Sequence, residues 1–227
     1  MALQDRAERL VVFDVNETLS DLGPLADAFV SVGAPGHLVN HWFSSVLRDG
    51  FALSLAGECP DFAELGRSEL RGLLSGYPLR TGADAAVEAI MAAFAGLPVH
   101  PDVADGIRAL RDKGLRVCTL SNGGTAFADA LLTHAGVRDL VAPLLSVQDV
   151  GAWKPRRAAY EYVTRATGVA AADLLLVAVH PWDCDGALRA GLEAAWINRT
   201  GVPYPTVFTT PSYSAASIVE LAEKLRT

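Results

Sequence analysis

Cysteine is scarce in this chain of 227 residues, which contains Cys59, Cys118 and Cys184 and no others. Three cysteines at wide spacing match neither a disulfide framework nor the paired spacing of a zinc site. Cys118 lies within an apolar run, where we expect it to be a small core residue. The sequence therefore predicts a fold that depends on neither disulfides nor cysteine-bound metal.

Long apolar runs and an excess of basic residues are also absent. No uncharged apolar stretch reaches the length of about 18 residues that is typical of a membrane helix. The formal net charge is −7, which disfavours nucleic acid and anionic membranes as partners but leaves a small anionic substrate open. The segment from Met1 to Arg9 is polar and lacks the apolar region of a signal peptide. We therefore expect a cytoplasmic protein, and its 51% hydrophobic residues are enough for a sizeable core.

The most informative segment is the one from Leu10 to Leu19. An apolar run of strand length ends abruptly at Asp14 and is followed by polar residues. A fully buried parallel strand has this pattern, and open α/β sheets bind ligands at the carboxyl ends of such strands. We therefore expect Asp14 to face a crevice, where its carboxylate can act as a nucleophile. The alternative is that Asp14 caps a turn.

Helical patterns fill the chain from about residue 24 to residue 95, and no strand pattern interrupts them. Pro24 suits the first turn of a helix that ends near Val32. A second helix follows Pro35-Gly36, and Asp61 can cap a third over residues 62–74. A fourth helix starts at Thr81 or Asp84 and runs through residue 94.

From residue 99 onwards, strand patterns alternate with helical patterns. We expect strands over residues 115–120, 144–147, 174–179 and 194–198, and helices over residues 102–113, up to 134, 155–167 and 183–190. This alternation is typical of βαβ units and a parallel sheet. The sequence therefore predicts an α/β core of residues 1–20 and 99–227, with a helical segment of residues 21–98 inserted after the first strand.

Polar side chains cluster at or just beyond the ends of several predicted strands. Asp14-x-Asn16-x-Thr18 follows the first strand and Ser121-Asn122 the second, while Lys154 and His180-x-x-Asp183 follow later segments. The carboxyl ends of parallel strands meet at one edge of the sheet, so these clusters can converge in space. One such cluster could be turn chemistry, but their shared position favours a single site.

These motifs resemble the haloacid dehalogenase-like hydrolase superfamily, and within it most closely the type II 2-haloacid dehalogenases. The resemblance covers nearly the whole chain. It implies a Rossmann-like core with the helical insert as a cap domain, and relatives of this type often form homodimers. It is carried by the strings Phe13-Asp14-Val15-Asn16-Glu17-Thr18-Leu19, Leu120-Ser121-Asn122-Gly123, Trp153-Lys154-Pro155 followed by Tyr160, Pro181-Trp182-Asp183, and Trp196-Ile197-Asn198-Arg199-Thr200-Gly201.

The resemblance implies a two-step reaction without a metal ion or cofactor. Asp14 attacks C2 of a small 2-haloalkanoic acid, expels halide and forms an ester on its own side chain. Water then hydrolyses this ester and releases a 2-hydroxy acid with inverted C2, as in an (S)-2-haloacid dehalogenase. Lys154 keeps the pKa of Asp14 low by opposite charge, and Asp183 orients or deprotonates the water. The alternative for Lys154 is a solvated surface position.

The same resemblance assigns substrate contacts around Asp14. Ser121 and the backbone N–H groups of Val15 and Asn16 hold the substrate carboxylate, and the Thr18 hydroxyl bonds a carboxylate oxygen. Asn122 donates its amide to the departing halide or to a substrate oxygen. Turn capping is the alternative for both hydroxyls, and a left-handed turn residue is the alternative for Asn122.

Two positions depart from the dehalogenase pattern. Phe43 stands where those enzymes carry a cap arginine that steers the substrate and cradles the halide. His180 stands where they usually carry asparagine, and it can act as a general base or as a strand-end residue bonded to backbone. We place Phe43, Tyr160 and Trp182 in the substrate pocket, although aromatic side chains also occur simply as core residues. These departures bear on the substrate range, and a small acid such as a haloacetate fits them.

Two other functions compete with this hypothesis. Phosphatases and phosphomutases of the superfamily carry a second aspartate where this chain has Asn16, and an acidic residue where it has Val179. Asparagine cannot exchange a proton at working pH, and a site without these acids would hold Mg²⁺ poorly. The second alternative is a catalytically weak relative that binds a small acid or a protein, which the missing cap arginine would suit.

Overall fold

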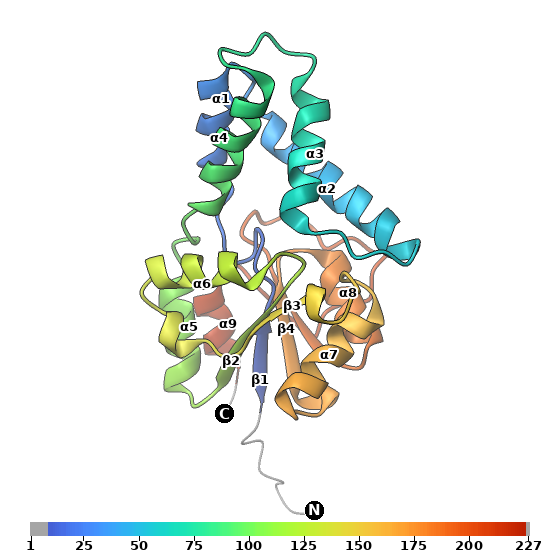
Figure 1. The fold of residues 1–227 in the computed structure, drawn as a ribbon. Coiled ribbons are helices and arrows are strands. Elements are labelled where there is room, and N and C mark those ends of the chain that lie inside the picture. Colours follow the sequence, from blue (N-terminus) through green and yellow to red (C-terminus); the bar gives the residue numbers. More distant parts are fainter. Residues whose placement is uncertain (1–8, 226–227) are drawn as a thin grey trace, which may run out of the picture.

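In the computed structural model, which describes residues 9–225, a parallel sheet of six strands forms the centre of the protein (Figure 1). The expectation about a signal peptide concerns residues that are mostly outside this described part. The strand order is β3-β2-β1-β4-β5-β6. The strands are β1 (Leu10–Phe13), β2 (Arg116–Ser121), β3 (Leu144–Ser146), β4 (Leu174–Ala178), β5 (Glu193–Ile197) and β6 (Tyr213–Ala215). The predicted α/β class and the parallel sheet are confirmed.

Strand β1 lies in the middle of the sheet, because its apolar residues must be covered on both faces. It pairs in parallel with β2 and with β4, and Phe13 is in register with Thr119 and Val177. Leu10 and Val12 belong to one buried cluster, whereas Val11 and Phe13 belong to the other. This period of two is what a central strand requires. It directs the end of β1 to the middle of the carboxyl edge.

Helices cover both faces of the sheet (Figure 1). One face carries α5 (Val103–Asp112), α6 (Thr125–His134) and α9 (Ile218–Lys224), and the other carries α7 (Arg157–Thr167) and α8 (Pro181–Arg189). Single 3₁₀ turns occur at η1 (Arg138–Leu140), η2 (Val147–Asp149) and η3 (Ala171–Asp173). Helix α8 begins two residues earlier than predicted because Pro181 occupies its first turn, where a missing N–H costs nothing.

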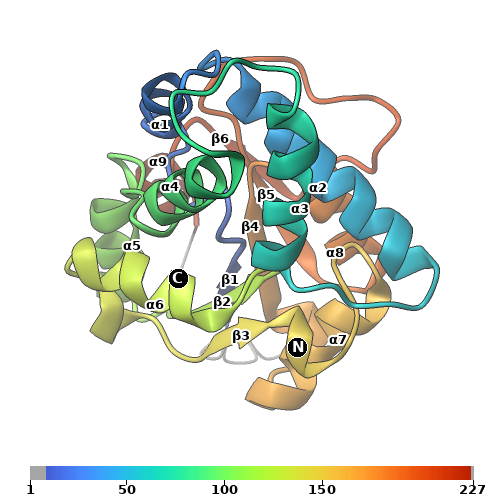
Figure 2. The same ribbon diagram turned by 45° about the horizontal axis from the view of Figure 1, so that its top comes forward.

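Four further helices stand beyond the carboxyl ends of the strands (Figures 1 and 2). They are α1 (Leu25–Val32), α2 (Leu38–Leu55), α3 (Phe62–Leu74) and α4 (Ala83–Ala95). The predicted cap of α3 is confirmed, since the Asp61 carboxylate accepts the backbone N–H groups of Ala63 and Glu64 at 2.9 Å. Gly82 precedes α4, so neither Thr81 nor Asp84 is its capping residue. The division into a core and a cap domain of residues 21–98 stays a prediction.

The insert and the core meet at Trp153. Its indole is fully buried, lies 6.0 Å from the ring of Phe62, and donates its N–H to the Pro60 carbonyl at 2.9 Å. Gly50 of α2 faces the same indole so closely that a Cβ atom there would overlap the ring. Glycine at this position therefore lets the longest helix of the insert approach the core.

The variant Gly50→Ala tests this contact. An added methyl group forces the rigid indole or α2 to move, so we expect the free energy of unfolding to fall by about 1–3 kcal/mol. Urea unfolding followed by circular dichroism measures the change. Gly72→Ala is the matched control because Gly72 is exposed in α3 and a Cβ there meets nothing within 4 Å. Helix propensity should make that control neutral or slightly more stable, and equal behaviour of the two variants would contradict the close contact.

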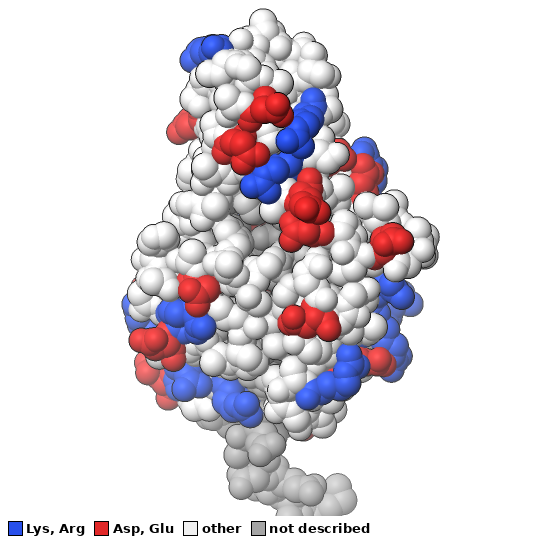
Figure 3. Space-filling view, in the orientation of Figure 1, with Lys and Arg blue, Asp and Glu red and all other residues white. Residues whose placement is uncertain are grey.

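Two observations concern helix length and the distribution of charge. No helix within residues 9–225 is both long and apolar enough to cross a bilayer. On the face shown in Figure 3, acidic and basic side chains are interspersed. This face therefore lacks the extended basic stripe that is typical of nucleic-acid binding.

Candidate active site

The turn after β1 holds Asp14 at the carboxyl edge of the sheet. The Asp14 N–H donates to the Val177 carbonyl at 3.0 Å, so the residue continues the pairing of β1 with β4. The chain then turns sharply, and Glu17 has a positive φ of 61°. This value is uncommon for a residue other than glycine and marks a constrained loop. Asp14 is 4% exposed, so the surrounding side chains determine its chemistry.

Lys154 lies between two carboxylates. Its Nζ atom is 2.7 Å from Asp14 Oδ1 and 2.7 Å from Asp183 Oδ2, and its side chain is fully buried. A buried ammonium group requires such partners, because an unpaired charge there would be very costly. The surface alternative for Lys154 is therefore wrong, and the predicted pairing with Asp14 is what the geometry shows.

The charge of Lys154 decides the protonation state of Asp14. Burial raises the pKa of Asp14, but the nearby Lys154 and the bonded His180 outweigh burial and hold the pKa well below its usual range. Burial lowers the pKa of Lys154, but Asp14 and Asp183 raise it by more than burial lowers it. The ammonium group therefore stays charged. An ionised carboxylate at neutral pH is the form that attacks carbon.

Asp183 has a different environment, although it shares Lys154. It lies in the first turn of α8, is fully buried, and accepts the Tyr160 hydroxyl at 2.6 Å. Burial raises the pKa of Asp183, and Lys154 and Tyr160 offset only part of that effect. A carboxylate with a raised pKa is a stronger base than a free one, which suits proton abstraction from water. The two carboxylates are therefore shifted in opposite directions.

Thr18 connects the nucleophile to the neighbouring strand. Its hydroxyl donates to Asp14 Oδ2 at 2.6 Å and accepts the Val179 N–H at 3.1 Å. The predicted bond to a carboxylate oxygen is thus made with Asp14 itself. Because the hydroxyl is fully buried, it fixes the rotamer of the carboxylate.

Ser121 and Asn122 lie at the end of β2, as predicted, and hold their own loop. The Ser121 hydroxyl accepts the Gly123 N–H at 2.9 Å, which is the turn-capping contact of the alternative reading. The Asn122 amide accepts the Lys154 N–H at 2.9 Å and donates to the Lys154 carbonyl at 3.4 Å. Asn122 does not have a positive φ, so the left-handed alternative is wrong. Its amide positions Lys154, and its contact with substrate stays a prediction.

Tyr160, Val15 and Asn16 are buried around the site. The Tyr160 hydroxyl is already bonded to Asp183, so it supports that carboxylate. Asn16 has a side-chain oxygen with no hydrogen-bond partner, and the side chain of Val15 belongs to the core. The substrate contacts predicted for these three residues remain predictions.

His180 lies against both Asp14 and Glu17. Its Nδ1 atom is 3.2 Å from Asp14 Oδ2, and its Nε2 atom is 2.8 Å from Glu17 Oε2. Phe43 and Trp182 stack with the ring at centroid distances of 6.2 and 5.0 Å. Burial lowers the pKa of His180, but the bonds to Asp14 and Glu17 outweigh it and raise the pKa to about 9. The alternative of a histidine bonded to backbone is wrong.

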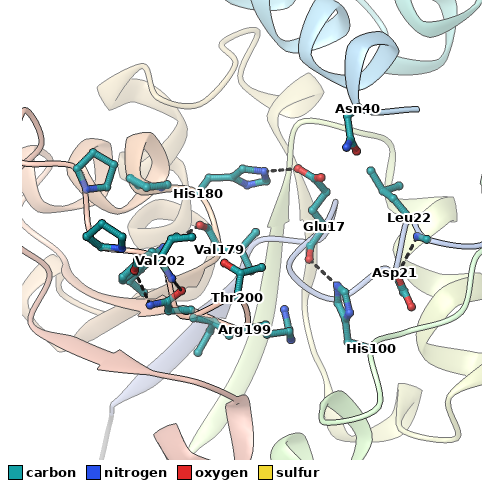
Figure 4. A pocket seen from close by; sticks show the side chains of 17 residues that line it. Glu17, Asp21, Leu22, Asn40, His100, Val179, His180, Arg199, Thr200 and Val202 are labelled. Carbon is teal, nitrogen blue, oxygen red and sulfur yellow. Dashed lines mark hydrogen bonds and ion pairs between the residues drawn. The ribbon is translucent and has the colours of Figure 1, made fainter. Parts of the chain in front are cut away.

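Glu17 was not among the predicted site residues. Its carboxylate binds His180, and its backbone carbonyl lies 2.9 Å from His100 Nε2 (Figure 4). The one signal in the sequence was its place in the polar loop after the first strand. That signal gives no direction for the side chain, which depends on the unusual φ of this residue.

A cavity of about 450 Å³ opens on the outer side of the pair formed by His180 and Glu17 (Figure 4). Its lining joins Leu22 and Asn40 of the insert side with Val179 and Arg199 of the core. A cavity of this size suits a small molecule. Asp14 does not line it, so His180 and Glu17 form the boundary between the cavity and the nucleophile.

The residues around Asp14 do not suit a divalent cation. The space between Asp14 and Asp183 is bridged by the ammonium group of Lys154. Asn16 and Val179 stand where further acids would be needed, and Mg²⁺ requires several hard oxygen ligands. Within residues 9–225, no group of three or more potential ligands is arranged to hold a metal ion.

A buried carboxylate paired with a buried lysine, at the carboxyl edge of a Rossmann-like sheet, is the arrangement that the sequence led us to expect of a haloacid dehalogenase-like hydrolase. A family model described as haloacid dehalogenase-like hydrolase matches residues 8–191. The chain belongs to this family.

Dehalogenases that act on 2-haloacids or haloacetate are among the proteins to which this chain is similar. An (S)-2-haloacid dehalogenase from Pseudomonas sp. (strain YL) is 36% identical over 60% of this chain and 58% of its own length, which is less than two thirds. Haloacetate dehalogenase H-2 from Moraxella sp. (strain B) is 29% identical over 90% of this chain and 92% of its own length. A crystal structure of an L-2-haloacid dehalogenase is 31% identical, covers 96% of this chain and 98% of its own, and has a TM-score of 0.88.

Proposed function

We propose that this protein hydrolyses small 2-haloalkanoic acids to 2-hydroxy acids through an ester on Asp14, without a metal ion. The observation that carries the proposal is the buried ammonium group of Lys154, which contacts Asp14 and Asp183 at 2.7 Å. It keeps the nucleophile ionised and leaves a second carboxylate for the water. The 2-haloacid dehalogenases among the relatives support the same substrate class.

In the first step, Asp14 displaces the halogen. A carboxylate oxygen forms a bond to C2 of the haloacid, the carbon–halogen bond breaks, and the halide leaves with the bonding electron pair. Asp14 Oδ2 accepts hydrogen bonds from Thr18 and His180, whereas Oδ1 accepts one from Lys154. A carboxylate oxygen has two lone pairs, so Oδ1 keeps one for the attack. Displacement from the opposite side inverts C2, so an (S)-2-haloacid would give the (R)-2-hydroxy acid.

In the second step, water hydrolyses the ester. The water oxygen attacks Cγ of Asp14, its proton passes to Asp183, and the bond between the ester oxygen and C2 stays intact. The bond between Cγ and the ester oxygen then breaks, and the 2-hydroxy acid takes the proton held by Asp183. The second proton of the water is released as the carboxylate of Asp14 is restored. Tyr160 and Lys154 hold Asp183 in place throughout. A carboxylate that acts as a general base typically accelerates the reaction by about 10²–10⁴-fold.

A substrate panel tests the proposal against its competitors. We expect halide release from chloroacetate and 2-chloropropionate that is unchanged by EDTA, because no step uses a metal ion. Halide electrodes and chromatography of the hydroxy acid measure the products, and a generic phosphate ester with Mg²⁺ is the parallel assay. Magnesium-dependent phosphate release would show a phosphatase instead. Release of neither halide nor phosphate from any of these compounds would favour a catalytically weak binding protein. The predicted homodimer and cytoplasmic location are separate questions.

A further inference from the structure

Both ring nitrogens of His180 face carboxylate oxygens. Asp14 Oδ2 lies 3.2 Å from Nδ1, and Glu17 Oε2 lies 2.8 Å from Nε2. A neutral imidazole has one N–H group and one lone pair, so one of the two contacts would set a lone pair against a carboxylate. An imidazolium donates at both nitrogens. The contacts therefore fit a protonated His180.

The other neighbours of His180 also favour a cation. Phe43 from α2 and Trp182 from α8 stack with the ring at interplanar angles of 19° and 27°, and aromatic faces attract cations. Asp14 and Glu17, both from the loop after β1, are the charged groups that contact the ring. Lys154 bonds to Asp14 and Asp183 and makes no contact with His180.

An anionic substrate needs such a cation near Asp14. Lys154 is fully buried and already bonded to two carboxylates. Around the cavity, Arg199 is paired with Asp102 at 3.0 Å, and burial lowers the pKa of His100. Arg199 has one guanidinium nitrogen without a partner, but its other nitrogens are held by Asp102 and the Thr18 carbonyl. His180 differs from Lys154 and Arg199 because it lines the cavity and also contacts Asp14, through the longer of its two bonds at 3.2 Å.

We propose that protonated His180, positioned by Glu17, is the anion-binding group of this site and takes the carboxylate of the haloacid or the departing halide. As the Asp14 oxygen bonds to C2, the negative charge of Asp14 is lost. Before this step the N–H of Nδ1, which makes the longer of the two bonds at 3.2 Å, is shared between Asp14 and the anion. After it, the N–H donates to the anion alone, while Glu17 keeps Nε2. No proton leaves the ring in this exchange. This inference rests on the proposed function and specifies how a site with Phe43 holds an anion.

The test measures the protonation of His180 directly and then anion binding. Nitrogen-detected NMR of the full chain gives its pKa, with the signal assigned by its absence in His180→Asn. We expect a pKa near 9 in the unmodified protein. In Glu17→Gln it should lie at least about one pH unit lower, since one carboxylate partner is lost. Glu58→Gln is the matched control because Glu58 is exposed and is not one of the carboxylates bonded to the ring. A pKa near 6.5, or equal values in both variants, would overturn the proposal.

Acetate and chloride serve as separate probes of the anion. Binding of each is followed by the shift of the His180 signal and by competitive inhibition where activity is found. We expect the dissociation constant of at least one anion to rise about tenfold per pH unit above the His180 pKa. In His180→Asn, anion binding should be roughly 10- to 100-fold weaker, and its dissociation constant should not depend on pH. If acetate binding depends on pH in this way, His180 binds the carboxylate of the substrate. If chloride binding does, His180 binds the departing halide. PH-independent binding of both would refute the inference.

These measurements stay informative if the protein releases no halide from any haloacid. In that case the proposed function fails, whereas the NMR pKa and the anion titrations still decide the role of His180. Conversely, an active dehalogenase with a neutral His180 at pH 7 would retain the proposed function and lose the inference. Thermal melts of each variant show whether a lost signal reflects unfolding.

Discussion

Replacing Asp14 with alanine is expected to reduce halide release from chloroacetate by at least about 10⁴-fold, the scale seen when a nucleophile is removed. No other carboxylate can take its place, because Asp183 is fully buried and bonded to both Lys154 and Tyr160. The measurement is halide release under saturating substrate. Asp105→Ala is the matched control, since Asp105 is exposed and pairs with Arg108 at the surface.

The ester intermediate gives this prediction a second, more specific readout. A single turnover in ¹⁸O water should place the label in the peptide that contains Asp14, because water attacks the carbonyl carbon of its ester. Rapid quenching with substrate should add the mass of the acid to the same peptide. Asp14→Asn is a weaker test than alanine because deamidation can partly restore the carboxylate. An active preparation with label or adduct elsewhere would contradict the mechanism.

Replacing Lys154 with methionine is expected to damage both stability and activity. The change leaves the buried carboxylates of Asp14 and Asp183 facing each other without their shared cation. Breaking a buried pair in this way typically costs about 3–5 kcal/mol. For a chain of this size, that corresponds to a fall in melting temperature of roughly 6–20 °C. Halide release should be lost as well, because the largest influence that lowers the pKa of Asp14 is removed and Asp183 loses the cation that holds it in place.

Two further variants separate charge from packing. Lys224→Met removes an exposed lysine that pairs with Glu220, and it should leave the melting temperature within about 2 °C. Lys154→Met combined with Asp183→Asn removes one of the opposed charges, so it should recover part of the lost stability without recovering activity. Equal stability of the single and double variants would show that the loss comes from packing alone.

The sequence predicted the elements that are long and buried. Strands β1, β2, β4 and β5 lie within one residue of their predicted bounds, because their apolar runs are covered on both faces. It missed β6 and α9. Ser214 of β6 is exposed, and α9 is short and depends on contact with α5, where Ile218 packs directly against Gly106. Such short elements are stabilised by distant neighbours and leave little local pattern.

The site was predictable to the same degree. The strand-end rule brought Asp14, Lys154 and Asp183 to one edge, and the structure places these three side chains in direct contact. The rule could not show which polar side chains hydrogen-bond to neighbouring residues of the site. Asn122, for example, accepts the backbone N–H of Lys154. Nor could the rule show that Glu17 turns toward His180, because that depends on a single unusual backbone angle. The direction of a side chain within a loop depends on contacts with residues that are distant in the sequence.

Trp153 and Lys154 are neighbours in the chain, and this adjacency has a mechanical consequence. The Trp153 indole packs against Gly50 of α2 and against the ring of Phe62. The next residue, Lys154, places its ammonium group between Asp14 and Asp183. The residue that contacts α2 and the residue that contacts Asp14 are therefore joined by a single peptide bond. A redesign of the helices within residues 21–98 for bulkier acids must preserve the contact between Gly50 and Trp153 if Lys154 is to keep its position.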